Sequence, residues 1–296
     1  MPAIRRARQI GATALQIFSD NPTAWRRRRE PPAKAPEFIE YARRHDIAPI
    51  AIHASYLINL AGSAQPFASQ SRQGLAHELQ SAPALGCRLV NTHIGSHRGG
   101  GRESGLRRII ANVDAVLADS PDDVTLVLEN SSGGGDNLGS RLEDLAAILA
   151  GVAPASAHRL AFCLDTAHLW GAGYDISSAS GALDVLERFD ALIGMDRLAL
   201  VHLNDSRSEL GSRSDRHEHL GAGRIGSEGL AAFLRDPRLA TRTAFMMETP
   251  GVDEGYDAVN MRRALLLFTG ERALPELPPK AFRLTRRSTR VGIGRP

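Results

Sequence analysis

Cysteine and lysine are scarce in this chain of 296 residues. The two cysteines, Cys87 and Cys163, lie far apart within apolar segments, which excludes a disulfide framework and indicates buried thiols in a reducing compartment. No run of about 18 apolar residues is available to span a membrane, and the N-terminus lacks the apolar core of a signal peptide. These absences favour a cytoplasmic globular protein with no membrane partner.

Because Lys34 and Lys280 are the only lysines, arginine supplies nearly all of the positive charge behind the net charge of +3. A GC-rich genome would explain this bias, and so would a phosphate-binding surface, since guanidinium groups bind phosphate oxygens bidentately. Arg26 to Arg29 follow Trp25 directly, and more arginines stand near the C-terminus. We expect residues 1–272 to form one domain and residues 273–296 to be a basic, disordered tail.

Short apolar runs bounded by turn residues predict seven strands, at 15–18, 49–55, 89–95, 125–131, 160–166, 198–205 and 244–250. Helical periodicity predicts helices at 3–10, 35–45, 67–85, 105–117, 141–150, 182–193, 229–234 and 256–267. Regular alternation of strand and helix predicts parallel βα units. Since polar residues gather where the strands end, we expect a (β/α)₈ TIM barrel, an α/β fold, that lacks its first β-strand in this chain.

Imidazoles and carboxylates stand at the ends of six of these strands. In chain order they are His53, His93, Glu129, Asp165 with His168, His202 and Glu248. Beyond the sixth strand, the alternating sequence Asp215-Arg216-His217-Glu218-His219 would place Asp215, His217 and His219 on one side if extended. A single histidine in an apolar strand is more often a hydrogen-bonded core residue than a ligand. A barrel, however, brings all six strand ends to one place.

So many ionisable groups cost several kcal/mol each to bury together unless a cation neutralises them, so the pattern predicts a metal site. Imidazole and carboxylate donors without a thiolate favour zinc, allow manganese or iron, and disfavour calcium and magnesium. The candidates are too many for one ion. They predict two or three metals that share a bridging carboxylate, which is an arrangement suited to phosphate displacement.

The segments around these residues resemble the motifs of the endonuclease IV family of apurinic/apyrimidinic (AP) endonucleases, within the xylose-isomerase-like TIM barrels. They are His53-Ala54-Ser55-Tyr56, Asn91-Thr92-His93-Ile94-Gly95, Leu128-Glu129-Asn130-Ser131, Cys163-Leu164-Asp165-Thr166-Ala167-His168, Gly173-Tyr174-Asp175, His202-Leu203-Asn204-Asp205-Ser206, Asp215-Arg216-His217-Glu218-His219 and Glu248-Thr249-Pro250. The resemblance runs in order from about residue 3 to about residue 270.

The resemblance implies a monomeric DNA-repair enzyme with three zinc ions, one of which manganese could replace. It assigns His53, His93 and Glu129 to one zinc, Glu129, Asp165, His202 and Glu248 to a second, and His168, Asp215 and His217 to a third. Glu129 and Glu248 would be catalytic, and His219 would either hold a metal ligand in place without binding metal itself or lie on the phosphate side of the site. The implied reaction is hydrolysis of the phosphodiester 5′ of an abasic site in double-stranded DNA, leaving a 3′-hydroxyl and a 5′-deoxyribose phosphate. Activity on blocked 3′ ends and association with a bacterial nucleoid are also implied.

Recognition of a missing base requires side chains that fill the gap in the base stack. Tyr56 and Leu57 resemble the insertion pair of the family, although both could be ordinary loop residues. Where the family often has an arginine before a tryptophan, this chain has Thr23. Either Arg26 to Arg29 substitute for that arginine, with Arg26 and Arg27 as the expected DNA-binding residues, or intercalation is weaker in this protein.

Two alternatives and one expectation about the gene remain open. A metal-dependent sugar isomerase or epimerase of the same barrel type would use one or two metals, and the segment around Asp215 would then have no purpose. A catalytically dead DNA-binding protein is the third possibility. Because the family begins with a strand carrying a Gly-Ala-His-Val-Ser-like segment that has no counterpart here, we expect an N-terminally truncated gene model.

Overall fold

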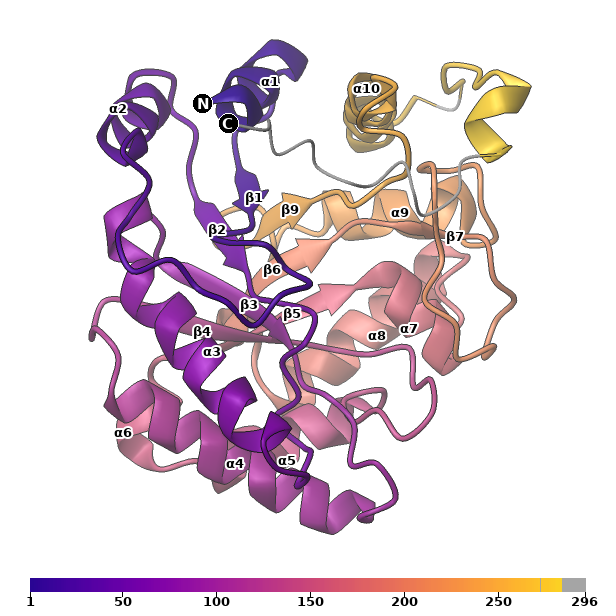
Figure 1. Cartoon of the computed structure of the whole chain (residues 1–296). Coiled ribbons are helices and arrows are strands. Elements are labelled where there is room, and N and C mark those ends of the chain that lie inside the picture. Colours follow the sequence, from indigo (N-terminus) through magenta and orange to yellow (C-terminus); the bar gives the residue numbers. More distant parts are fainter. Residues whose placement is uncertain (272, 284–296) are drawn as a thin grey trace.

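The computed structural model describes residues 1–271 and 273–283, and its centre is a parallel sheet of seven strands (Figure 1). In spatial order these are β1 (Leu15–Ile17), β2 (Ile50–His53), β3 (Leu89–His93), β4 (Thr125–Glu129), β5 (Leu160–Asp165), β6 (Leu198–His202) and β9 (Ala244–Met246). The sheet curls into a nearly closed TIM barrel whose two edges are β1 and β9. The predicted fold class is confirmed.

Helices surround the barrel (Figure 1). They are α1 (Pro2–Ile10), α2 (Ala35–Arg44), α3 (Phe67–Ser81), α4 (Arg102–Ala118), α5 (Leu142–Gly151), α6 (Pro154–Ala157), α7 (Thr166–Ala172), α8 (Ala179–Leu192), α9 (Gly226–Arg235) and α10 (Tyr256–Thr269), with 3₁₀ turns η1 (Pro83–Leu85), η2 (Met195–Arg197) and η3 (Pro279–Arg283). The sequence did not predict α6 and α7, which are too short for helical periodicity to be visible. No helix in the described part of the chain is long and apolar enough to cross a membrane.

The barrel interior explains why the polar strand ends converge. Small and apolar side chains fill the barrel interior on the amino-terminal side of the strand ends: Ala51, Val127, Ala161, Cys163, Leu200, Ala244 and Met246. Successive side chains of a strand point to opposite faces, so the residue two positions further on points into the interior again. Those next interior positions hold His53, Glu129, Asp165, His202 and Glu248. The strand period alone therefore gathers these ionisable groups in one layer at the carboxyl end of the barrel.

A short ribbon follows β6, which ends at His202, before the predicted boundary at residue 205. There β7 (Asp205–Ser206) pairs antiparallel with β8 (His217–Glu218), and the loop between them carries Asp215. The buried Asp205 carboxylate accepts hydrogen bonds from the backbone N–H of Gly223 and Ile225, both at 2.9 Å. These bonds fix the glycine-rich loop 221–226 beside the ribbon.

The segment after α10 packs against the barrel up to residue 283. Within it, η3 buries Ala281, and Leu274 packs on the main core. The rest of the predicted tail, residues 284–296, lies outside the described residues, and the domain boundary at residue 272 stays a prediction.

Candidate metal centre

The first group of potential ligands consists of His53 on β2, His93 on β3 and Glu129 on β4. Their donor atoms all lie within 4.8 Å of one another. His53 Nε2 is 3.7 Å from Glu129 Oε2, and His93 Nδ1 is 3.9 Å from Glu129 Oε1. His53 and Glu129 are buried, while His93 is one-third exposed. The three residues predicted for one metal are thus brought together.

The second group consists of Asp165, His202 and Glu248, whose donor atoms also lie within 4.8 Å of one another. His202 Nδ1 is 3.9 Å from Asp165 Oδ2 and 3.4 Å from Glu248 Oε2. The same nitrogen is 3.4 Å from Glu129 Oε1. Glu129 therefore lies between the first and second groups, as a bridging carboxylate must.

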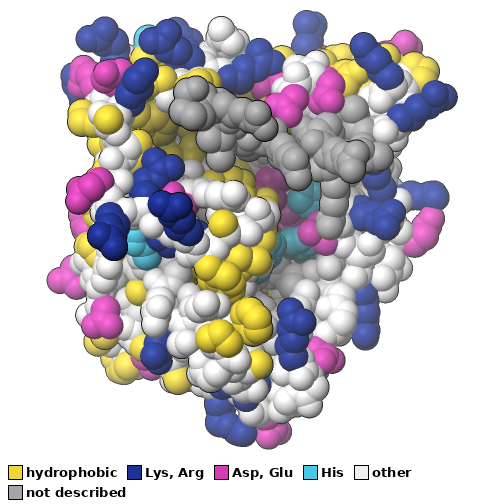
Figure 2. Space-filling view, in the orientation of Figure 1, with side chains coloured by type: hydrophobic (Ala, Val, Ile, Leu, Met, Phe, Trp, Pro, Cys, Tyr) yellow, Lys and Arg dark blue, Asp and Glu magenta, His cyan; other side chains and the backbone are white. Residues whose placement is uncertain are grey.

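The third group lies where α7 meets the loop before β8. His168, His217 and Asp165 place donor atoms within 4.8 Å of one another. Asp215 Oδ1 is 3.4 Å from His168 Nε2 and 3.1 Å from His217 Nε2. The predicted trio of His168, Asp215 and His217 is assembled, and Asp165 joins it as a link to the second group. Figure 2 shows histidine and acidic side chains gathered in the hollow at the middle of this face.

One nitrogen of each of four imidazoles is held by a fixed partner. Nδ1 of His53 contacts the carbonyl oxygen of Ala54 at 2.7 Å, and Nδ1 of His168 contacts that of Asn130 at 3.0 Å. Nδ1 of His217 contacts the backbone carbonyl oxygen of Glu248, and Nε2 of His202 contacts the side-chain oxygen of Gln16. When one ring nitrogen donates to such an acceptor, the other nitrogen points toward the carboxylates, and it is the atom that would bind a metal once it has lost its proton.

Three neutral side-chain amides orient the carboxylates. The sequence alone did not identify these amides as functional. Asn91 donates to Glu129 Oε2 at 2.6 Å, Asn204 donates to Asp165 Oδ2 at 2.7 Å, and Gln16 donates to Glu248 Oε1 at 3.0 Å. Asn91 and Asn204 stand two residues from His93 and His202 respectively. For Asn91 that spacing was the available signal, because within β3 it places Asn91 on the same face as His93.

Negative carboxylates and protonatable imidazoles lie close together in the cluster, and each shifts the pKa of the other. Burial opposes ionisation of Glu129, but His93 and His202 hold its pKa well below the usual range. Burial also opposes ionisation of His217 and by itself would lower the pKa of the imidazole. Asp165 and Asp215 outweigh burial and raise that pKa to about 9. A proton on the His217 imidazole thus offsets part of the carboxylate charge, and a divalent cation would replace that proton.

The donor set fits metal ions. Glu129 Oε1, His202 Nδ1 and His217 Nε2 are buried and make no hydrogen bond within residues 1–271 and 273–283. Buried polar atoms are normally satisfied, so three such atoms facing shared space indicate a missing partner. Each group supplies three or four nitrogen and oxygen donors, which is the complement of a catalytic zinc site with an open position.

Cys163 was expected to be a buried thiol without chemistry, and the structure places it beside the cluster. Its sulfur belongs to a further donor group with Glu129 and His202. Burial raises the pKa of the Cys163 thiol to about 12, which keeps it protonated and a poor ligand.

Of the residues predicted to bind DNA, Tyr56 lies best placed. The residue is 54% exposed, and its ring centre is 5.3 Å from that of His53. Leu57 is half-buried next to it, and Arg26 is exposed. Arg27 is a correction: its side chain is only 9% exposed and lies against the buried Glu78 on α3, with Nε 3.6 Å from the carboxylate. This pairing satisfies Glu78 and turns Arg27 away from solvent.

His219 is a second correction. It is fully buried and contacts Asn260 on α10 and the carbonyl oxygen of Ala281 in η3. Because β8 ends at Glu218, the alternation that the sequence suggested does not extend to residue 219. None of its hydrogen bonds within the described part of the chain reaches a predicted ligand, which contradicts a role in holding one. A place on the phosphate side of the site stays a prediction.

Known proteins are similar to this chain in sequence and in fold. Residues 4–267 match the family model described as xylose isomerase-like TIM barrel. A protein of Haloquadratum walsbyi named "Probable endonuclease 4" is 36% identical over 261 residues, which are 88% of this chain and 91% of that protein. The crystal structure of endonuclease IV from Thermus thermophilus superposes with a TM-score of 0.79 at 36% identity, covering 91% of this chain and 94% of that one. A D-tagatose 3-epimerase-like protein shares only the fold, with a TM-score of 0.67 at 17% identity, over 90% of this chain and 91% of that one.

Proposed function

The chain belongs to the xylose isomerase-like TIM barrel family and, within it, to the endonuclease IV family, and we propose that it is a zinc-dependent AP endonuclease of DNA repair. Its substrate is double-stranded DNA with an abasic site, and it hydrolyses the phosphodiester 5′ of that site. The products carry a 3′-hydroxyl and a 5′-deoxyribose phosphate. Blocked 3′ ends are a second substrate class, and the place of action is the nucleoid of a bacterial cytoplasm.

One observation carries this proposal: three groups of ligand atoms share Glu129 and Asp165 between them. Three zinc ions, one of them replaceable by manganese, would be held by His53, His93 and Glu129, by Glu129, Asp165, His202 and Glu248, and by His168, Asp215 and His217. Bound there, the ions would lower the pKa of water and neutralise charge on the attacked phosphate. A sugar isomerase needs no third group, and the epimerase-like match is too distant to support more than the fold.

The carboxylates of the site have different roles in the proposed reaction. Glu129 and Asp165 are fully buried, whereas the side chain of Glu248 is 27% exposed and faces the open side of the cluster. Gln16 holds Glu248 Oε1, which leaves Oε2 on the side of His202. Glu248 is therefore the carboxylate that can orient the attacking water, while Glu129 would hold the cations of the first and second groups.

Tyr56 and Leu57 would fill the gap left by the missing base. Tyr56 stands beside His53 and Phe18, with ring centres 5.3 Å from both, so its exposed ring borders the metal centre. A planar ring at that place can stack on a neighbouring base, which is worth about 1–3 kcal/mol. Arg26 is exposed on the adjacent loop and adds a phosphate contact.

Incision of an end-labelled duplex with one tetrahydrofuran abasic analogue tests the proposal. We expect cleavage only on the 5′ side of the lesion, by protein whose metal content is measured in the same sample. Glu129→Gln keeps the size of the side chain but removes the bridging charge, and we expect it to lower the rate by more than a thousandfold. Glu40→Gln, on the outer face of α2, is the matched control.

Three outcomes would contradict the proposal. They are an intact abasic duplex with metal-loaded protein, equal cleavage of undamaged DNA, and full activity of the Glu129→Gln variant. Isomerisation of a ketohexose by the same metal-loaded protein would favour the sugar enzyme instead.

A further inference from the structure

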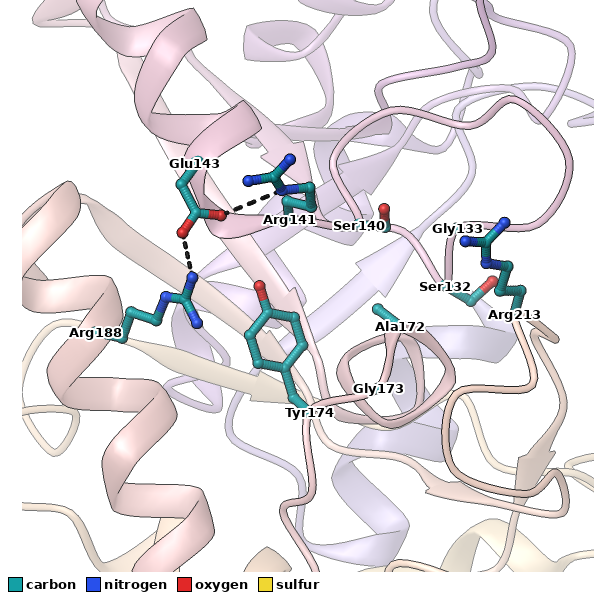
Figure 3. A pocket seen from close by; sticks show the side chains of 10 residues that line it. All are labelled: Ser132, Gly133, Ser140, Arg141, Glu143, Ala172, Gly173, Tyr174, Arg188 and Arg213. Carbon is teal, nitrogen blue, oxygen red and sulfur yellow. Dashed lines mark hydrogen bonds and ion pairs between the residues drawn. The ribbon is translucent and has the colours of Figure 1, made fainter. Parts of the chain in front are cut away.

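A polar cavity of about 400 Å³ opens among loops that follow the carboxyl ends of the strands, where the metal centre also lies. Figure 3 shows the side chains that line it. We propose that this cavity binds a backbone phosphate of the DNA strand, a few nucleotides away from the phosphate that is hydrolysed. The inference rests on the proposed function, because it takes DNA as the source of the phosphate. Its walls come from the loop after β4, the start of α5, the end of α7, the helix α8 and the loop between β7 and β8.

The walls are connected directly to metal ligands. Ser132 in the wall follows Glu129 by three residues, and Arg213 precedes Asp215 by two. Since a chain spans at most about 3.6 Å per residue, these wall residues lie within about 11 Å and about 7 Å of the ligands. Phosphates on one DNA strand recur about every 3.4 Å along the helix axis. A strand held at the metal centre would therefore bring another phosphate within reach of the cavity.

Positive charge dominates the cavity. Three arginines, Arg141, Arg188 and Arg213, line it together with a single carboxylate, that of Glu143. Figure 3 shows Glu143 paired with both Arg141 and Arg188. Three guanidinium groups against one carboxylate leave about two positive charges to be neutralised.

Arg213 is the arginine best placed to receive an anion. Its guanidinium makes no hydrogen bond or ion pair with the residues of the chain that the structure describes. Its backbone is fixed, because it lies in the left-handed region at φ 56° and its N–H donates to the carbonyl of Gly171 at 2.9 Å. Figure 3 shows its side chain beside Ser132 and Gly133, across the cavity from Glu143. A free guanidinium on a fixed backbone is suited to binding two phosphate oxygens.

The opposite wall is also fixed in place. The Tyr174 hydroxyl accepts a hydrogen bond from the backbone N–H of Leu142 at 3.1 Å, and the Arg188 guanidinium lies 5.9 Å from the Tyr174 ring centre. Gly133 has φ 80°, and a Cβ there would come within 3.0 Å of the Ser140 Cβ. Any side chain at residue 133 would narrow the cavity next to Arg213, so glycine keeps it open.

The test measures how strongly protein binds the incised product duplex as salt is increased. Each lost phosphate contact reduces the slope of log Kd against log salt by about one. We expect Arg213→Ala to weaken binding about tenfold and to reduce the slope by about one, whereas Arg213→Lys keeps the slope. Arg43→Ala, which removes the same charge from the distant end of α2, is the matched control and should change neither quantity.

Glu143→Gln provides a test in the opposite direction. Removing the carboxylate frees Arg141 and Arg188, so we expect binding to tighten several-fold. A variant that is merely damaged in folding cannot give that result. Trimming the duplex on one side of the lesion to two nucleotides should abolish the effects of both Arg213→Ala and Glu143→Gln, whereas trimming the other side should not.

The outcomes separate this inference from the proposed function. Normal incision by Arg213→Ala with an unchanged salt slope would overturn the phosphate subsite and leave the endonuclease intact. Wild-type protein that neither binds nor cuts DNA would refute the proposed function and DNA as the source of the phosphate. In that case calorimetry with pyrophosphate decides the rest: binding lost in Arg213→Ala would show a site for a free phosphate ligand, and no binding by either protein would overturn the site altogether.

Discussion

Gln16 and Glu248 are hydrogen-bonded across the two edge strands of the barrel, with 3.0 Å between Gln16 Nε2 and Glu248 Oε1. Gln16 is on β1, and Glu248 follows the end of β9. Gln16 Oε1 also contacts Nε2 of His202 at 3.0 Å. One amide therefore orients two potential ligands of the same group and joins the edges of the sheet at that level.

Replacing Gln16 by methionine should weaken metal binding at the second group. Methionine keeps the length of the side chain but removes both hydrogen bonds, and loss of such outer contacts typically lowers metal affinity by about 10–100-fold. The measurement is zinc affinity by chelator competition, together with thermal unfolding of the metal-free protein. Gln80→Met, on the exposed face of α3, is the control. Unchanged affinity in Gln16→Met would show that the amide does not orient the ligands.

The pH dependence of the metal-free protein follows from His217. Asp165 and Asp215 outweigh the effect of burial and raise its pKa to about 9, against an ordinary value of 6.5. A pKa raised in the folded state gives stability that is fully present below about pH 6.5 and is lost as the pH rises through about 9. We expect the Tm of the metal-free protein to fall over this window and zinc affinity to rise, because the competing proton leaves.

His217→Gln is the control for that pH effect and should reduce the slope of both curves between about pH 6.5 and about pH 9. A Tm of metal-free wild-type protein that is constant across the window would show that His217 holds no extra proton.

The loop 221–226 should depend on the Asp205 carboxylate. Asp205 is fully buried and accepts backbone N–H groups of Gly223, Ile225 and Ser206. Asp205→Asn places an N–H₂ group against N–H donors, and we expect a loss of about 2–3 kcal/mol in the free energy of unfolding, measured with urea. The exposed Asp175→Asn, with its local bonds to Ser177, should cost less than about 1 kcal/mol. Equal losses in both variants would contradict this role of Asp205.

Tyr56 should matter for DNA and not for folding. Because Tyr56 is 54% exposed, Tyr56→Ala removes little buried surface, yet it removes about 1–3 kcal/mol of stacking on a base. We expect KM for the abasic duplex to rise about tenfold with an unchanged Tm. Phe268→Ala, also exposed, is the control. An unchanged KM in Tyr56→Ala would remove this residue from lesion recognition.

The ligand positions could be predicted from the sequence because they depend on local rules. A parallel strand has a fixed side-chain period, and a barrel brings the ends of its strands together, so His53 or Glu129 could be placed without knowing any other residue. Gln16 could not, since its role arises from contacts with His202 and Glu248, more than 180 residues away in the chain.

The two corrections have the same cause. Arg27 was predicted to face DNA from its place in a run of arginines, but the buried carboxylate of Glu78, 51 residues later, pairs with it. His219 was predicted from an alternating sequence, but the strand ends at Glu218 and Asn260 on α10 binds the imidazole. Both outcomes depend on which distant side chain requires a partner, and sequence spacing does not contain that information.

The most direct test of the central claim is a crystal structure of the zinc-loaded protein with anomalous diffraction measured on both sides of the zinc edge. The account predicts three anomalous peaks: one between His53, His93 and Glu129, one between Asp165, His202 and Glu248, and one between His168, Asp215 and His217. A single peak, or peaks away from these groups in protein that still cleaves abasic DNA, would contradict it.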